Sequence, residues 1–144
     1  MMRRAAIVSP MRTGVGRFGG ALAGFPAGEL GAIILKELMA RTKIDPERVD
    51  DVVFAHGYPN GEAPCVARWS WLAAGLPESV PGVSLDRRCG SGLQAVIDAA
   101  MRVATGAADI VVAGGVESMS QVEYYSTDHR NGARMGSTTF HDRL

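Results

Sequence analysis

The spacing of apolar residues along the chain predicts three helices. Over 27–42, apolar residues recur three and four positions apart, which is the period of an amphipathic helix with a wide apolar face. The segments 65–74 and 93–105 are also typical of helices, and each is followed by a glycine, Gly75 or Gly106, of the kind that commonly ends a helix. We therefore expect three helices that each bury one face.

Short runs rich in apolar residues predict strands between these helices. The runs 5–9, 49–55, 82–85 and 110–113 are too short for helices. Asp-Pro-Glu at 45–47 predicts a single helical turn before the second run. Because 110–113 contains no polar residue, it is typical of a central strand in a sheet. The alternation of strands and helices predicts an α/β domain with a mixed, mostly parallel sheet packed by helices.

Composition agrees with one folded domain. The chain has 144 residues, 47% of them hydrophobic, and a domain of this size buries roughly 70% of its unfolded surface. Lys+Arg and Asp+Glu number 15 each, so no net charge attracts the chain to nucleic acid or to a membrane surface. No segment approaches the roughly 18 apolar residues of a membrane span. Two cysteines are too few for a disulfide framework. We expect a soluble cytoplasmic protein that binds neither nucleic acid nor membrane.

Cys89 is the strongest candidate for chemistry. It follows the run 82–85 and three charged residues, and Gly90, Ser91 and Gly92 separate it from the helical pattern. These small residues leave the backbone near the thiol uncovered, and the start of a helix favours a thiolate over a thiol. A buried structural cysteine is the alternative, since cysteine is among the most buried residue types. The residues alone leave both roles open.

Other residues that could carry chemistry lack a motif. The glycines and the proline that follow His56 predict a loop there, and we expect His56 to be a solvated or hydrogen-bonded structural residue. Cys65 is also expected to be structural. His129 and His141 are expected at the surface. The run 14–19 formally matches the dinucleotide pattern G-x-G-x-x-G, but no helix opens at its last glycine, so we interpret it as a loop.

Two of the predicted strands end next to small residues that matter for a site. In an open parallel sheet, ligands bind beyond the carboxyl ends of the strands. Cys89 follows one strand end, and Gly114-Gly115 follows the run 110–113. We therefore expect Cys89 and this pair of glycines to be neighbours.

Two segments resemble the thiolases, the acetyl-CoA C-acyltransferases. DRRCGSGLQAV at 86–96 resembles the family's nucleophile segment, and AGGVESMS at 113–120 is similar to its second N-terminal signature. Weaker likeness at 12–13, 18–20 and 132–136 extends the resemblance over nearly the whole chain. The resemblance implies the N-terminal half of a thiolase.

The resemblance also implies a domain organisation. Residues 1–120 correspond to the N-terminal α/β domain that carries the nucleophile, and 121–144 correspond to the truncated start of a loop domain that caps the active site and helps subunits associate. A homodimer or homotetramer is implied, together with a C-terminal thiolase half. That half is expected because the family's Gly-His-Pro, Asn-Glu-Ala-Phe and Cys-x-Gly motifs do not occur in this sequence.

The activity that the resemblance implies is ping-pong acyl transfer, in which Cys89 carries the acyl group as a thioester while a 3-ketoacyl-CoA is formed or cleaved. Acyl-CoA and CoA are the implied substrates, with no cofactor and no metal, and the implied setting is fatty acid metabolism. The N–H of Cys89 matches a donor to the family's oxyanion hole. Without the C-terminal half, we expect these 144 residues to be inactive.

The nucleophile segment departs from the family at two positions. Asp86 replaces the usual asparagine, and Arg88 replaces an apolar residue. Arg88 either acts on Cys89 as a nearby positive charge or pairs with Asp86, and we favour the pair. Two other functions stay open: a non-catalytic thiolase-fold protein for assembly or regulation, with Cys89 a relic or a redox-sensitive thiol, and another condensing enzyme such as a ketoacyl synthase. The AGGVESMS segment favours a thiolase over the latter.

Overall fold

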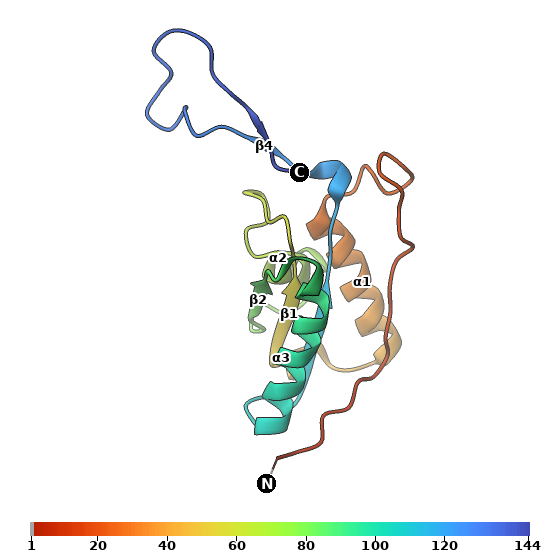
Figure 1. Ribbon diagram of the computed structural model, residues 1–144. Helices are drawn as coiled ribbons and strands as arrows, with labels where there is room; N and C mark the ends of the chain where they lie inside the picture. The colour runs from red at the N-terminus through yellow and green to blue at the C-terminus, as the bar shows by residue number, and fades with distance from the viewer. Residues whose placement is uncertain (1) are drawn as a thin grey trace.

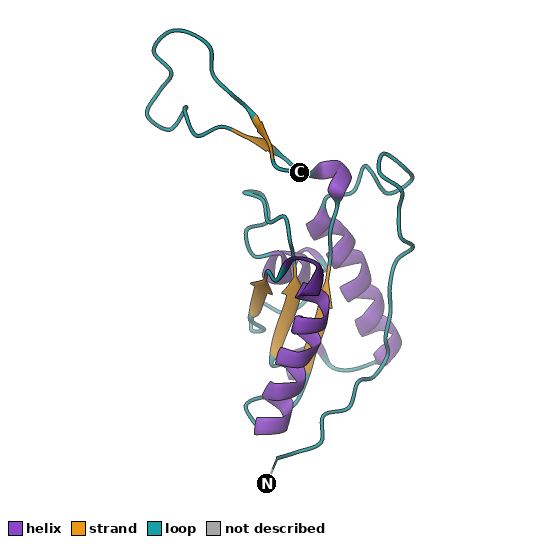
Figure 2. Cartoon of the chain, in the orientation of Figure 1, coloured by secondary structure: helices purple, strands orange, loops and turns teal. Residues whose placement is uncertain are grey.

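A three-stranded parallel sheet lies at the centre of the computed structural model, which describes residues 2–144. Its middle strand is β1 (Asp51–Ala55), with β2 (Gly82–Leu85) on one side and β3 (Val111–Gly115) on the other. Both pairings are parallel, with Val52 opposite Gly82 and Val112. The predicted α/β alternation and parallel sheet are confirmed (Figure 2).

Helices cover both faces of this sheet (Figure 1). α1 (Ala27–Thr42) and α2 (Val66–Ala73) pack against each other on one face, and α3 (Ser91–Thr105) covers β1 and β3 on the other. The first helix has the predicted bounds, whereas α3 starts two residues earlier than predicted. The predicted single turn is a 3-10 turn, Pro46–Arg48. No helix in residues 2–144 is long and apolar enough to cross a membrane.

The core lies between the sheet and the α1–α2 layer. Trp71 has no exposed surface, and its indole N–H donates to the carbonyl of Pro77 at 2.8 Å. The two helices approach closely where α1 carries Gly28 and Gly31. The hydroxyl of the fully buried Ser70 donates to the carbonyl of Gly28 at 2.9 Å, and a Cβ on Gly31 would overlap that hydroxyl oxygen. Small residues on α1 therefore set the distance between these helices.

The N-terminal run 5–9, predicted as a buried strand, forms no strand, and this prediction is wrong. It belongs to a segment without helix or strand, residues 3–19, that we call the arm (Figure 1). Ile7 and Val8 of the arm are 77% and 67% exposed. The run has the apolar residues of a strand, but no backbone hydrogen bond within residues 2–144 joins it to a neighbouring strand, and a strand forms only where its backbone has a partner.

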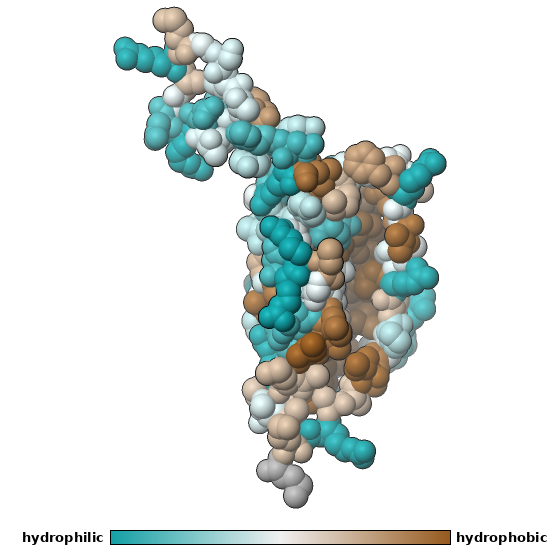
Figure 3. All heavy atoms as spheres, viewed as in Figure 1, coloured by the Kyte–Doolittle hydropathy of each residue, from teal (hydrophilic) through white to brown (hydrophobic). Residues whose placement is uncertain are grey.

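The two ends of the arm are bonded to the rest of the domain. Its middle makes no hydrogen bond to the sheet within residues 2–144. At one end, the N–H of Arg3 donates to the carbonyl of Ala104 at 2.9 Å, and its guanidinium lies 2.6 Å from the carboxylate of Asp109. At the other end, the N–H of Gly19 donates to the hydroxyl of Ser120 at 2.9 Å. A cavity of about 890 Å³, which we call the groove, lies between the arm and β3. Figure 3 shows it as a hollow lined by hydrophobic residues.

β3 was predicted to be central, but it lies at the edge of the sheet, beside the groove. The prediction is wrong because an apolar strand shows only that both of its faces are buried. Its composition does not show whether another strand pairs with each of its two edges. The strand also includes Gly114 and Gly115, which were predicted to follow it. A Cβ on Gly114 would lie 2.8 Å from the ring of Phe54, and one on Gly115 would lie 2.7 Å from the Cβ of Ala55.

The last residues form a hairpin that projects away from the sheet (Figure 1). β4 (Tyr124–Tyr125) pairs with β5 (His141–Asp142) in an antiparallel arrangement. Arg143 and Glu123 form an ion pair at 2.5 Å beside it. His141 and His129 are both exposed, as predicted from the sequence.

Candidate functional site

Cys89 lies in a single 3-10 turn, Arg88–Gly90, between β2 and α3. The predicted order of strand, tight turn and helix is therefore confirmed, and the thiol is free and exposed. The carboxyl ends of all three parallel strands meet at this edge of the sheet, beside the N-terminus of α3. The turn therefore presents Cys89 where ligands bind in sheets of this class.

Ser91 fixes the shape of the turn. Its side chain is buried, and its hydroxyl accepts a hydrogen bond from the N–H of Arg87 at 2.6 Å and donates to the carbonyl of Arg88 at 2.7 Å. The N–H of Gly90 donates to the carbonyl of Arg87 at 3.0 Å. The sequence marked Ser91 only as a small neighbour of the cysteine, whereas its hydroxyl bonds to both residues before Cys89.

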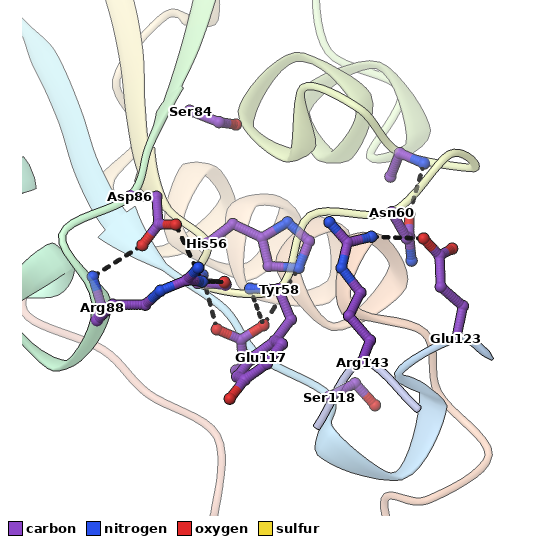
Figure 4. Close-up of polar contacts among 12 residues, drawn as sticks. His56, Tyr58, Asn60, Ser84, Asp86, Arg88, Glu117, Ser118, Glu123 and Arg143 are labelled. Atoms are coloured by element: carbon purple, nitrogen blue, oxygen red, sulfur yellow. Dashed lines mark hydrogen bonds and ion pairs between the residues drawn. The ribbon is translucent and has the colours of Figure 1, made fainter. Parts of the chain in front are cut away.

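Arg88 pairs with Asp86, which is the role favoured from the sequence. The guanidinium lies 3.1 Å from the carboxylate, and the N–H of Arg88 donates to the same carboxylate at 2.8 Å. The guanidinium also donates to the carbonyl of Gly57 and lies over the ring of Tyr58, 5.7 Å from its centre (Figure 4). Arg88 has φ 48°, a left-handed conformation that is uncommon for a residue with a side chain. Its contacts with three residues offset the cost of that conformation.

Glu117, just after β3, contacts the loop of residues 56–58, which Arg88 also contacts (Figure 4). Its carboxylate accepts hydrogen bonds from the N–H groups of Gly57 at 2.8 Å and Tyr58 at 3.3 Å, and lies 3.3 Å from Nε2 of His56. Burial raises the pKa of Glu117, but the hydrogen bonds from His56 and from the two N–H groups outweigh it, so the pKa lies below its ordinary value. Glu117 and Arg88 together hold residues 56–58 against the Cys89 turn.

His56 is 3% exposed, so the solvated alternative from the sequence is wrong and the hydrogen-bonded one is confirmed. Its Nδ1 has no hydrogen-bond partner among residues 2–144. A cavity of about 350 Å³ lies beside it, lined by Gly92 of the nucleophile segment and by Gly115 of β3. The expected proximity of the Cys89 turn and the paired glycines is thus observed.

We predict that Glu117→Gln weakens the fold in a pH-dependent way. Because folding lowers the pKa of Glu117, its carboxylate contributes stability above the unfolded pKa of about 4.3, and this is lost as the pH falls through the lower folded pKa. The variant should be less stable than the wild type by about 1 kcal/mol near neutral pH, a value discounted for the 34% exposure of the side chain. The difference should shrink below about pH 4.

Urea unfolding across this pH range measures the effect, and Glu62→Gln, at an exposed loop position, is the matched control. A difference between wild type and Glu117→Gln that stays constant from neutral to acid pH would contradict the prediction.

Cys65 occupies a different environment from Cys89. It is partly buried at the start of α2, where its Sγ lies 3.4 Å from the carbonyl of Gly82 and 3.7 Å from the hydroxyl of Ser84. The glycine run 14–19 lies within the arm, away from any helix start. Among the described residues 2–144, no group of three or more His, Cys, Asp or Glu side chains is placed to hold a metal ion.

Residues 5–144 match the family model for the N-terminal domain of thiolases. The chain belongs to the thiolase family. It is 49% identical to a steroid 3-ketoacyl-CoA thiolase of Mycobacterium tuberculosis over 85% of this chain and 30% of the relative. It is 42% identical to an acetyl-CoA acetyltransferase of Cupriavidus necator over 99% of this chain and 36% of the relative.

A solved structure agrees with this family assignment. The crystal structure of the Bacillus anthracis acetyl-CoA acetyltransferase superposes with a TM-score of 0.81 at 39% identity, covering 88% of this chain and 32% of the other. The thiolase-like α/β fold predicted from the sequence is confirmed. The chain spans about a third of the length of the curated relatives it matches.

Proposed function

We propose that this chain supplies the nucleophile for acyl transfer between coenzyme A thioesters, with Cys89 carrying the acyl group. The observation that supports this most is the exposed Cys89 thiol on a turn fixed by the buried Ser91, where three strand ends meet the start of α3. An exposed thiol on a rigid turn can be approached by a substrate, and small residues on both sides of the helix start leave room for it.

In the cleavage direction, the Sγ of Cys89 forms a bond to the ketone carbon of a 3-ketoacyl-CoA. The carbon–carbon bond next to that ketone breaks, and the departing acetyl-CoA takes up a proton. The thiol of a second CoA then attacks the Cys89 thioester, which releases a shortened acyl-CoA and the free cysteine. The N–H of Cys89 makes no hydrogen bond within residues 2–144, so it is free to donate to the oxygen that becomes negative.

The remaining parts of the proposal follow from the family. The base that takes the thiol proton would come from a C-terminal thiolase half, because His56 is buried and bound to Glu117. Residues 121–144 would begin a loop domain that caps the site. The complete assembly would be a homodimer or homotetramer that acts in the cytoplasm on acyl-CoA and CoA in fatty acid metabolism, and the 144 residues alone would be inactive.

We predict that brief, substoichiometric iodoacetamide labels Cys89 about tenfold more than Cys65 in the folded chain near neutral pH. The reason is that Cys89 is exposed, whereas Cys65 is partly buried with polar contacts to its sulfur. Peptide mass mapping measures the ratio, with Cys65→Ser and Cys89→Ser as the matched pair. Equal labelling, or label concentrated on Cys65, would remove the chemical basis for naming Cys89.

The activity itself is tested by adding a 3-ketoacyl-CoA to a complete enzyme that contains this chain and a C-terminal half. The proposal requires an acyl group on the Cys89 peptide, absent in Cys89→Ser. If Cys89 is reactive toward iodoacetamide but never acylated, the acyl-transfer proposal is wrong and the non-catalytic alternative is favoured.

A further inference from the structure

We propose that Arg88 binds a carboxylate at the far end of the acyl group that Cys89 carries. The substrates would then be coenzyme A thioesters of dicarboxylic acids. This inference deepens the proposed function and rests on it for the acyl group, whereas the carboxylate site itself can be tested without acyl transfer.

The first observation is the position of Arg88, directly before Cys89. The thiolases that this segment resembles usually have an apolar residue there. The side chain of Arg88 is 69% exposed, so a ligand attached to the neighbouring thiol can approach it. A guanidinium is a poor neighbour for a purely apolar acyl chain and a good one for a chain that ends in a carboxylate.

The second observation is that the guanidinium of Arg88 is held in place (Figure 4). Its Nη1 lies 3.1 Å from the carboxylate of Asp86 and also donates to the carbonyl of Gly57. The group lies over the ring of Tyr58, 5.7 Å from its centre. Because these contacts already order the side chain, a ligand that binds it loses less conformational entropy than one that binds a mobile arginine.

The third observation is that one edge of this guanidinium has unused donors. An arginine side chain has five N–H groups in a fixed fork. The contacts with Asp86 and Gly57 use Nη1, and no hydrogen bond within residues 2–144 uses Nε or Nη2 of Arg88. The edge formed by Nε and Nη2 matches the two oxygens of a carboxylate, which guanidinium groups commonly bind through two parallel hydrogen bonds.

The carboxylates of the protein do not occupy this edge. Asp86 is the partner of Arg88 on the Nη1 side, and it forms the ion pair of Arg88 among residues 2–144. Glu117 lines the same cavity as Arg88, but its oxygens accept hydrogen bonds from Gly57 and Tyr58 and lie beside His56. The unused edge of Arg88 is therefore available to a carboxylate from a ligand.

The cavity of about 350 Å³ beside this arginine has room for such a ligand. It is lined by Arg88 on one side of Cys89 in the sequence and by Ser91 and Gly92 on the other. A Cβ on Gly92 would meet no atom within 4 Å, so the start of α3 leaves this space open. The volume is at the small end of the roughly 300–1,000 Å³ of ligand pockets, which suits a short acyl group.

The acyl group is the favoured source of the carboxylate. CoA itself carries phosphates, which arginine also binds, but they lie at the opposite end of a long flexible arm from the thioester. The far end of an acyl group on Cys89 lies only a few bonds from the sulfur. Arg88, the next residue in the chain, is within the range of a short acyl group rather than of the CoA phosphates.

The test is disulfide exchange at Cys89 in the 144-residue chain with Cys65→Ser. The reagents are disulfides of mercapto carboxylic acids of increasing chain length and of their neutral amides. Each exchange converts the Cys89 thiol to a mixed disulfide and releases one reagent thiol. Intact mass measures the acid-to-amide ratio at equilibrium, with glutathione as the reference thiol. We expect a ratio about tenfold above that of glutathione at one chain length and a smaller one at shorter lengths.

Two neighbouring arginines provide matched variants. Arg88→Gln removes the charge but keeps an amide that can donate to the carbonyl of Gly57, and it should reduce the ratio to that of glutathione. Arg88→Lys keeps the charge without the fork and should retain part of the preference. Arg87→Gln is the control, because Arg87 bonds to Gln94 at 2.5 Å and does not line the cavity. It should respond like the wild type.

Three results would overturn the proposal: no preference for the acid at any chain length, an equal loss in Arg87→Gln and Arg88→Gln, or a preference abolished by adenosine bisphosphate. The second would show a general positive field at the turn. The third would assign Arg88 to the phosphate-bearing end of CoA.

The carboxylate site and the proposed function can fail separately. In a complete enzyme, a 3-ketoacyl-CoA that ends in a carboxylate should acylate Cys89 faster than its neutral amide, and Arg88→Gln should remove the difference. A preference in the disulfide test without acylation of Cys89 would contradict the proposed function and the acyl source of the carboxylate, but not the site. Equal acylation by acid and amide would leave the proposed function in place and overturn the role of Arg88.

Discussion

Trp71→Ala is expected to lower the free energy of unfolding by about 3–5 kcal/mol, a large fraction of the roughly 5–15 kcal/mol that stabilises a typical protein. Trp71 has no exposed surface, and it packs in the cluster that joins α1, α2 and the sheet. The substitution leaves a cavity that a helix-packed core cannot close, and it removes the hydrogen bond to the carbonyl of Pro77.

Urea unfolding followed by circular dichroism measures this loss. Trp69→Ala is the matched control, because Trp69 is on the same helix but 36% exposed, where it covers Gly28. Its cost should be about 1–2 kcal/mol. If the two variants lost the same stability, the assignment of Trp71 to the centre of the core would be wrong.

Gly31→Val is expected to cost about 2–3 kcal/mol by forcing the two packed helices apart. An added Cβ would overlap the hydroxyl of Ser70 and would lie 2.9 Å from its Cβ and 3.4 Å from the ring of Phe54. Ser70 is fully buried and bonded to the carbonyl of Gly28, so it has no space to move into. The gain in helix propensity over glycine, about 0.5 kcal/mol, does not offset this overlap.

The same unfolding measurement tests the second variant. Ala40→Val, at an exposed position on α1, controls for the effect of a β-branched residue on the helix and should cost about 0.5 kcal/mol. Combining Gly31→Val with Ser70→Gly should recover part of the loss, because the overlapping atoms are then absent. If the losses in the free energy of unfolding of the two single variants simply added in the double variant, the helices would not meet at these residues.

The elements that the sequence predicted well are those with local signals. The bounds of α1 follow from its apolar period, and α3 ends at Gly106, which has the left-handed backbone expected of a glycine after a helix. The place of a strand in a sheet depends instead on partners far away in the sequence. The run 5–9 and β3 both read as buried strands, and neither pattern shows that a gap separates them.

The residues of the candidate site also differ in whether their signal in the sequence is local or long-range. The sequence could single out Cys89 as a candidate, and predict its turn between a strand and a helix, because its small neighbours and the helical pattern after it are adjacent in the sequence. Glu117 was missed because its contacts with residues 57 and 58 span 60 and 59 positions. The signal available for it was topological: Glu117 follows a strand whose carboxyl end shares an edge with the strand before His56.

The contacts of Arg3 also set when the arm can attach to the rest of the chain during synthesis. Arg3 bonds to groups near Val103 and Asp109, which lie 100 and 106 positions later in the chain. At a translation rate of about 5–20 residues per second, roughly 5–20 seconds pass before a ribosome makes those partners. The arm is therefore synthesised early but anchored late, after α1, β1 and α2 have all been synthesised.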